Sequence, residues 1–292
     1  MSQPTRLGIG VLYNPVLFNL LREETGLVDY VEIIPDMFWT LAERNGMSAY
    51  TEHDDLIDQF DELAARLPVV LHSVGLSIGS VDFFDERHVA QIALWQRRFN
   101  SPWHSDHLSF NRISVSGHDR HAGLAMPIPY DSDLLDLVSA RVRQVQATVP
   151  TLFLLENNVY FFDLPEQEMT EPEFLNRLCR ETGCGLVLDI HNVYANARNH
   201  GFDARDFVTQ IDPSFITEMH IAGGSEFQGM YTDSHAGPVP EPVWQNLEHA
   251  LAHAPGVRAV TYEFHHSYYR DLKDDGVRKQ LIRARDVWSR LR

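Results

Sequence analysis

Imidazole and carboxylate side chains recur at intervals along this 292-residue chain, which has 15 His, 41 Asp+Glu and only 2 Cys. Imidazole and carboxylate together suit zinc, manganese or iron, whereas soft metals prefer sulfur. Two cysteines exclude a disulfide scaffold and a four-cysteine zinc site. The composition therefore favours a metal site built from nitrogen and oxygen ligands.

The candidate ligands lie at the ends of short apolar segments or in the loops that follow them. A single ion takes roughly four to six ligands, so a set of this size predicts two or three ions. A carboxylate such as Glu156 is able to bridge two of them. The candidates are His72, His107, Glu156, Asp189, Asn192, His220, Asp233, His235 and Glu263.

Each of these residues has a structural alternative, because one buried His or Glu is more often a hydrogen-bonded core residue than a ligand. That alternative must hold independently at six strand ends, and buried carboxylates are rare unless paired or metal-bound. For Asp106 and Glu218 we expect the structural role. Asp106 is expected to orient a neighbouring ligand instead of binding the metal itself.

Two further features could contact a substrate. Gly223 and Gly224 precede Ser225, and their backbone N–H groups could hold a carboxylate or could simply form a turn. Arg198 follows a predicted strand and could meet an anionic substrate, although a helix cap or a surface ion pair explains it equally well.

The elements that must position these residues form a repeated β–α pattern. Segments long enough for crossover helices separate most of the apolar runs, several of which are continuously apolar, as in strands buried on both faces. Thr170 is expected to cap one such helix, and Asp131 or Ser132 another. The predicted strands span residues 7–13, 30–34, 69–72, 103–108, 152–156, 185–189, 216–221 and 259–264.

Eight such units predict an α/β protein with a single (β/α)8 TIM-like barrel over residues 1–292. The carboxyl ends of barrel strands converge on one open end, where active sites are built, so distant candidates should meet there. No segment reaches the roughly 20 apolar residues that span a bilayer, and the first six residues lack the apolar region of a secretory signal. We expect a cytoplasmic protein without a membrane partner. A net charge of −17 argues against nucleic acid.

Seven ordered motifs between about Leu7 and Glu263 resemble the multinuclear non-heme iron-dependent oxidase (MNIO) family, whose best-known member is MbnB. Together they form a far more specific signal than any one of them. The motifs are His72-Ser-Val-Gly-Leu-Ser, Ser105-Asp106-His107-Leu108, Leu155-Glu156-Asn157, Leu188-Asp189-x-x-Asn192-Val-Tyr, Asn199-His-Gly-Phe, Met219-His220-Ile-Ala-Gly and Asp233-Ser-His235.

The resemblance implies a barrel holding two or three irons of mixed Fe(II) and Fe(III) state, with O2 as co-substrate. It also implies modification of a cysteine, expected at the C-terminus, in a ribosomally made precursor peptide that a small companion protein recruits. Carried over by motif, one iron would be bound by His72, His107 and Glu156. A second would be bound by Asp189, His220 and Glu263 with Glu156 bridging, and a third by Asn192, Asp233 and His235. The catalytic set would be His72, His107, Glu156, His220 and Glu263.

The sequence departs from the common family pattern at two places. It has His191 where many members have Asn, and Gly224 where many have His. We therefore expect a substrate pocket, including His191, Arg198, Gly223 and Gly224, that is unlike the pocket of MbnB. The expected pocket is more similar to that of the TglH branch, which excises the cysteine β-carbon in 3-thiaglutamate biosynthesis.

Three classes of function remain open from the residues alone. The first is the O2-dependent oxidase, with either β-carbon excision or conversion of cysteine to an oxazolone and thioamide. The second is a redox-inert metal barrel, because xylose-isomerase-like and endonuclease-like barrels also gather His, Asp and Glu at strand ends. The third is a non-catalytic protein that binds metal or peptide. Iron with oxygen sensitivity distinguishes the first class from the second, and oxygen consumption with a peptide distinguishes it from the third.

Overall fold

The computed structural model describes residues 6–44, 47–116 and 118–291. In this part of the chain eight parallel strands close into a barrel with the order β1-β14-β11-β10-β9-β6-β5-β2, confirming the predicted fold class. The barrel strands are β1 (Gly8–Leu12), β2 (Tyr30–Ile33), β5 (Val69–Ser73), β6 (Trp103–His107), β9 (Leu152–Glu156), β10 (Gly185–Asp189), β11 (Ile216–Ala222) and β14 (Ala259–Glu263).

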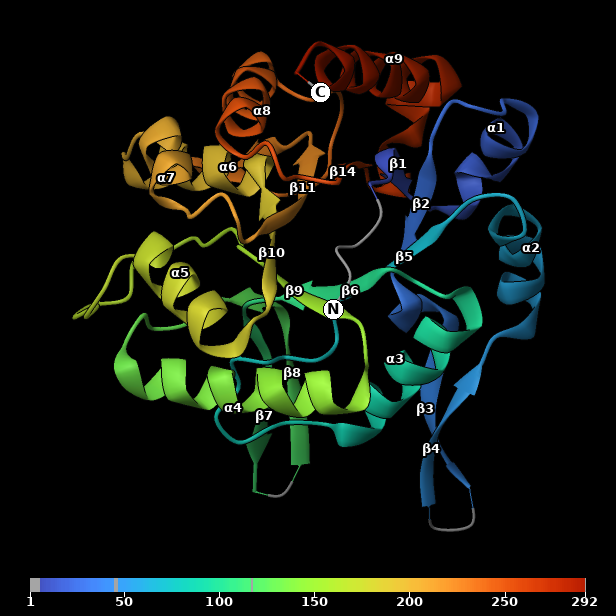
Figure 1. Ribbon diagram of the computed structural model, residues 1–292. Helices are drawn as coiled ribbons and strands as arrows, with labels where there is room; N and C mark the ends of the chain where they lie inside the picture. The colour runs from blue at the N-terminus through green and yellow to red at the C-terminus, as the bar shows by residue number, and fades with distance from the viewer. Residues whose placement is uncertain (1–5, 45–46, 117, 292) are drawn as a thin grey trace.

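The helices form an outer ring around these strands (Figure 1). Their apolar faces pack on the outward-facing strand residues and form the main core of the protein. They are α1 (Phe18–Glu23), α2 (Asp54–Ala64), α3 (Glu86–Phe99), α4 (Ser132–Thr148), α5 (Glu171–Thr182), α6 (Ile190–His200), α7 (Ala204–Gln210), α8 (Glu241–His253) and α9 (Tyr269–Leu291), with short 3-10 turns η1 (Pro15–Leu17), η2 (Pro35–Phe38) and η3 (His266–Tyr268).

The expected helix caps are present. The Thr170 hydroxyl accepts a hydrogen bond from the Glu173 N–H at 3.3 Å, which starts α5. Asp131, not Ser132, caps α4, because its Oδ1 accepts from the Leu134 N–H at 2.8 Å.

Three antiparallel hairpins were not predicted from the sequence. Each follows the carboxyl end of a barrel strand, so all three belong to the loops at the open end of the barrel. The β3–β4 and β7–β8 hairpins extend beyond the helical ring (Figure 1). The pairs are β3 (Trp39–Arg44) with β4 (Met47–Glu52), β7 (Phe110–Val115) with β8 (His118–Met126), and β12 (Ser225–Phe227) with β13 (Met230–Thr232).

The residues that point into the barrel change character along each strand. Alternate residues of a strand face the same side, so the inward set can be followed in steps of two. Near the amino ends it forms a small apolar cluster that includes Tyr30, Val70, Trp103 and Leu154. Only glycine fits at position 10, where a Cβ would lie 2.3 Å from the Tyr30 ring. Two residues further along, the inward positions become polar and acidic.

Candidate metal centre

The predicted ligands converge at the carboxyl end of the barrel, although the first and the last of them, His72 and Glu263, are 191 residues apart in sequence. Most are fully buried, with exposed fractions of 0–3%, which is unusual for acids and imidazoles. They come from β5 (His72), β6 (His107), β9 (Glu156), β10 (Asp189), the first turn of α6 (Asn192), β11 (His220), the loop after β13 (Asp233 and His235) and β14 (Glu263).

The first group of ligand atoms comprises His72, His107 and Glu156. Glu156 Oε2 lies 3.2 Å from Nε2 of His72 and 3.3 Å from Nε2 of His107. The two imidazole Nε2 atoms are 3.1 Å apart. Three ligand atoms therefore face one point, as a coordinating set would.

The second group comprises Glu156, Asp189, His220 and Glu263. The Nδ1 atom of His220 lies 3.7 Å from Glu156 Oε1 and 3.4 Å from Glu263 Oε2. The two oxygens of Glu156 thus face different groups: Oε2 faces His72 and His107, while Oε1 faces His220. This is the arrangement expected of a bridging carboxylate.

The residues of the predicted third group are only partly brought together. Asp233 Oδ1 lies 3.0 Å from Nε2 of His235, which is also 3.7 Å from Glu263 Oε2. Asn192 instead donates from its side chain to the Asn157 carbonyl at 3.1 Å and leaves its Oδ1 unpartnered. The neighbour of Asp233 on the other side is His191, with Nδ1 at 3.1 Å.

The charges within the cluster depend on one another. Burial disfavours the imidazolium of His107, but the Glu156 carboxylate outweighs burial and raises the pKa of His107 to about 9. In return, and against the effect of burial, His107 and His72 hold the pKa of Glu156 well below its usual range. Burial lowers the pKa of His72 to about 4.

Several acids of the cluster lie close to one another. Burial and the neighbouring Glu156 carboxylate raise the pKa of Asp189 well above its usual range, because a further negative charge is unfavourable there. Against burial, Asp233 raises the pKa of His235 to about 10. A bound cation would relieve the repulsion among these carboxylates.

Several buried atoms of ligand type have no hydrogen-bond partner. An unpaired polar atom in the interior costs about 1–3 kcal/mol, so native proteins rarely leave several in one place. Within the cluster these atoms are Glu156 Oε2, Asp189 Oδ2, Asn192 Oδ1, both nitrogens of His191 and His220, and Asp233 Oδ1. The nitrogen and oxygen donors therefore fit metal ions.

Glu32 joins the cluster and was missed by the sequence analysis. It is fully buried on β2, and its Oε2 lies 3.2 Å from Nε2 of His220. Its Oε1 lies 3.6 Å from Nδ1 of His72, so Glu32 faces the side of both imidazoles that points away from Glu156. Glu32, His72 and His220 also form a third group of mutually close ligand atoms. The sequence signal that could have identified Glu32 is an acid within an apolar predicted strand.

Ser105 is a second residue that the analysis missed. Its hydroxyl lies 2.9 Å from Nδ1 of His72, which fixes the ring so that Nε2 faces His107 and Glu156. The expected orienting residue, Asp106, lies one position further along β6 and faces the opposite side of the strand. Its carboxylate accepts from the Leu76 N–H at 3.2 Å and makes no ligand-orienting hydrogen bond among the described contacts.

Glu218 has the structural role that was expected of it. Its Oε1 accepts from the hydroxyls of Tyr30 at 2.9 Å and Thr261 at 2.8 Å. Its Oε2 accepts from the Trp103 indole N–H at 2.7 Å. Both oxygens are satisfied without an ion.

The four predicted substrate contacts lie in different environments. His191 is fully buried. Arg198 is half-exposed and forms an ion pair with Glu226, which was one of the alternatives expected for it. Its Cζ atom lies 5.0 Å from the centre of the Tyr231 ring. A Cβ on Gly223 would lie 2.2 Å from the Ala236 carbonyl oxygen, so this glycine permits close backbone packing.

The two departures from the common family pattern are neighbours in space. A Cβ on Gly224 would lie 2.7 Å from Nε2 of His191 and 2.4 Å from the Thr232 carbonyl oxygen. The imidazole at position 191 thus occupies the space that a side chain at position 224 would need. In this chain, His191 and Gly224 are a matched pair.

The described helices include none with the length and apolar character needed to cross a membrane. The fold has many counterparts among solved structures. D-psicose 3-epimerase from Clostridium cellulolyticum H10 aligns with a TM-score of 0.61 at 11% identity, covering 97% of this chain and 99% of that one. The IOLI protein, solved with a zinc atom, aligns with a TM-score of 0.57 at 15% identity, covering 98% and 99%. At such low identity the likeness concerns the fold alone.

The sequence comparisons are more specific. A UPF0276 protein of Rhizorhabdus wittichii is 36% identical over 228 residues, covering 77% of this chain and 75% of the relative. A UPF0276 protein of Caulobacter vibrioides is 31% identical over 254 residues, covering 87% and 85%. Residues 6–272 match the family described as "RiPP precursor modification enzyme MbnB/TglH/ChrH", where RiPP denotes a ribosomally made and then modified peptide. The chain therefore belongs to the MbnB/TglH/ChrH family of RiPP precursor modification enzymes.

Proposed function

We propose that this protein is a multi-iron, O2-dependent oxidase that modifies a cysteine in a ribosomally made precursor peptide. Family membership supports the peptide substrate, and the ligand cluster supports the metal. The irons would be held by His72, His107 and Glu156, by Asp189, His220 and Glu263 with Glu156 bridging, and by Asn192, Asp233 and His235. When bound, iron supplies O2 activation and a Lewis-acid site for the substrate thiolate.

One observation carries the proposal: buried nitrogen and oxygen atoms face one another without hydrogen-bond partners, and the candidate ligand groups among the described residues include no cysteine. The two cysteines of the chain, Cys179 and Cys184, form a separate buried pair with sulfurs 3.8 Å apart. A cysteine ligand is thus left for the substrate to supply.

The cluster has a closed side and an open side. His72, Glu156 and His220 have exposed fractions of 0–2% and would hold the metals away from water. The side chains of His107, Asp233 and His235 are 27%, 19% and 23% exposed. These three residues would meet the entering peptide and orient its cysteine.

For the reaction we favour excision of the cysteine β-carbon, as in 3-thiaglutamate biosynthesis by the TglH branch. The Cα–Cβ and Cβ–S bonds break, and a Cα–S bond forms. One O2 balances the change if both of its oxygen atoms leave with the β-carbon as formic acid, so no other reductant is needed. His191 and Gly224, which replace the Asn and His common in the family, support a pocket different from that of MbnB. The alternative reaction converts the cysteine to an oxazolone and a thioamide.

The partners follow from the same proposal. The substrate would be a precursor peptide with a C-terminal cysteine, and a small companion protein would recruit it. A short reading frame that encodes a cysteine-containing peptide beside the gene would support this arrangement.

The experiment combines metal analysis with mass spectrometry of the co-expressed peptide. We expect protein purified without oxygen to contain iron, and the peptide to lose the mass of one CH2 group only when O2 is admitted. Glu156→Ala should lose most of the iron and all turnover. Full turnover by that variant, or product formed without any oxidant, would overturn the proposal.

The fold favours one competitor, a redox-inert metal barrel, because epimerases share this architecture. The same purification distinguishes the two. Zinc or manganese in place of iron, together with turnover that is indifferent to O2, would establish the competitor.

A further inference from the structure

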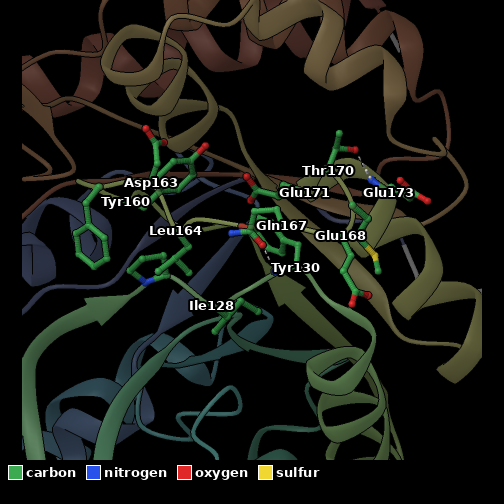
Figure 2. A pocket seen from close by; sticks show the side chains of 13 residues that line it. Ile128, Tyr130, Tyr160, Asp163, Leu164, Gln167, Glu168, Thr170, Glu171 and Glu173 are labelled. Carbon is green, nitrogen blue, oxygen red and sulfur yellow. Dashed lines mark hydrogen bonds between the residues drawn. The ribbon is translucent and has the colours of Figure 1, made fainter.

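A cavity of about 480 Å³ is lined by residues outside the metal centre and contains none of the candidate ligands. We call it the acidic pocket. It is formed by the segment after β8, the loop between β9 and α5, and the first turn of α5 (Figure 2). Its lining residues are Pro127, Ile128, Tyr130, Tyr160, Phe162, Asp163, Leu164, Gln167, Glu168, Met169, Thr170, Glu171 and Glu173.

The lining combines apolar walls with acids and contains no Lys or Arg. Ile128 and Met169 are buried beneath it, and Tyr130 and Tyr160 contribute aromatic rings, while Phe162 is 43% exposed. Aromatic faces attract cations, and apolar walls accommodate the methylene groups of long basic side chains. The chemistry of this lining selects a positively charged ligand with an aliphatic stem.

Glu171 is the buried acid of the lining; Tyr130 hydrogen-bonds its carboxylate, and one carboxylate oxygen stays available to such a ligand. Asp163 is already bound by His200 Nδ1 at 2.8 Å, and Glu168 by the Ser132 N–H at 2.9 Å. Glu171 is only 7% exposed, and its Oε2 has no hydrogen-bond partner. Burial raises the pKa of Glu171 to about 8, as expected for an acid that lacks a cation beside it.

The acidic pocket is held open by contacts between its two main segments. The Glu168 and Met169 N–H groups donate to the Tyr130 carbonyl at 3.2 and 3.1 Å, and the Tyr130 N–H donates to the Gln167 side chain. Such cross-links preform the walls, which reduces the entropy cost of binding.

The loop from β9 connects the pocket to the metal centre. Tyr160 stands four residues after Glu156, and four residues span at most about 14 Å. The Tyr160 N–H donates to Asn196 Oδ1 at 3.0 Å, and the Asn196 side chain donates to the Asn158 carbonyl at 2.8 Å, so α6 holds this loop in place. A peptide of a few residues could therefore reach both places.

We propose that the acidic pocket binds a lysine or arginine side chain of the substrate peptide, a few residues from the cysteine that is modified. The ligand's charge pairs with Glu171, and its methylene groups pack between Tyr130 and Tyr160. This assignment rests on the proposed function for the identity of the ligand as a peptide. The pocket would select which cysteine enters the metal centre.

Binding of a synthetic peptide tests this inference independently of turnover. The probe is fluorescein-labelled Arg-Gly-Gly-Gly-Ser, in which serine replaces cysteine, and its match carries citrulline, a neutral isostere of arginine. On the metal-loaded protein, fluorescence anisotropy should give binding about tenfold tighter for the arginine peptide, the effect of one charge-assisted contact. Equal binding of the two peptides would overturn the inference.

Two variants test whether Glu171 causes the preference for the arginine peptide. Glu171→Gln should remove the preference for arginine, whereas Glu181→Gln, an exposed acid on the same helix, should retain it. An unchanged preference in folded Glu171→Gln would also overturn the inference. If that variant does not fold, the wild-type comparison decides alone. Metal-depleted protein should keep the preference, so a failure of the proposed oxidase leaves this result unaffected.

Discussion

Two layers of acids lie inside the same barrel, one above the other, and only one of them is satisfied by protein. In the lower layer Glu218 accepts hydrogen bonds from Tyr30, Trp103 and Thr261. In the upper layer Glu156 and Asp189 each keep a buried oxygen without a partner. The residue types are the same, so the difference lies in the donors around them. A buried acid does not by itself indicate a metal site, whereas a buried acid without hydrogen-bond donors around it does.

Glu32 lies at the boundary between the two layers. Its Oε2 accepts from the Thr261 hydroxyl, as in the lower layer, while its Oε1 has no partner and faces His72, as in the upper layer. The side chain of Glu32 therefore marks the level at which the barrel interior changes from a hydrogen-bonded core to the candidate metal centre.

Removal of the metal should produce the largest loss of stability, and this loss should come from the upper layer only. An ion present at a thousand times its dissociation constant stabilises the folded state by about 4 kcal/mol. Chelation should therefore lower the melting temperature markedly, and calorimetry with and without added iron measures the change. An identical melting temperature for the stripped and loaded proteins would remove the distinction between the layers.

Glu218→Leu should give the next largest effect, this time in the lower layer. The Trp103 indole N–H would lose its acceptor, and the hydroxyls of Tyr30 and Thr261 would lose one of theirs, which we expect to destabilise the protein by about 3 kcal/mol. Denaturant unfolding measures the loss, and metal analysis should give the same iron content as wild type. If iron is lost while stability is retained, the assignment of the layers is wrong.

A third buried acid, Glu171, tests the rule at a site outside both layers. Because its folded pKa is about 8 and its unfolded value near 4.5, the folded state binds the extra proton, and stability falls as the pH rises between these values. The slope cannot exceed about 1.4 kcal/mol per pH unit for one proton. Glu171→Gln should flatten this part of the profile, while Glu181→Gln should leave it unchanged.

Ser105→Ala should give the smallest effect. Loss of the hydroxyl beside His72 Nδ1 frees the ring, and such changes typically weaken metal binding about tenfold. Competition with a chelator measures the affinity. Ser139→Ala removes a buried hydroxyl that has no partner and serves as the control. Equal losses in both variants would indicate a general packing effect.

The sequence predicted the barrel strands closely, because most of them are short apolar runs; β6, with the sequence WHSDH, is an exception. The segments at residues 152–156 and 185–189 match β9 and β10 to the residue. The three hairpins were missed because most of their described residues are at least partly exposed, although Trp39 of β3 lies in the main core. The convergence of the nine candidate ligands followed from the barrel itself, since parallel strands end on one side.

The partners of each side chain could not be predicted in the same way. Glu32 and Asp106 are both acids on strands, yet one faces the metal ligands and the other the helical layer. Which face a strand residue occupies depends on register, and one step reverses it. For Gly223 and Gly224 the sequence left open a carboxylate site or a turn, and it gave no sign of the close tertiary packing around both glycines.

The barrel closes where β1, near the start of the chain, pairs with β14, near its end. Glu263 is the last residue of β14, so the set of candidate ligands is complete only after residue 263 has been synthesised. Until the first and last strands meet, the acids and imidazoles are spread along an open chain. If the metal needs the whole candidate set, it would bind only after the barrel has closed, so the topology of the fold would set when the site becomes available.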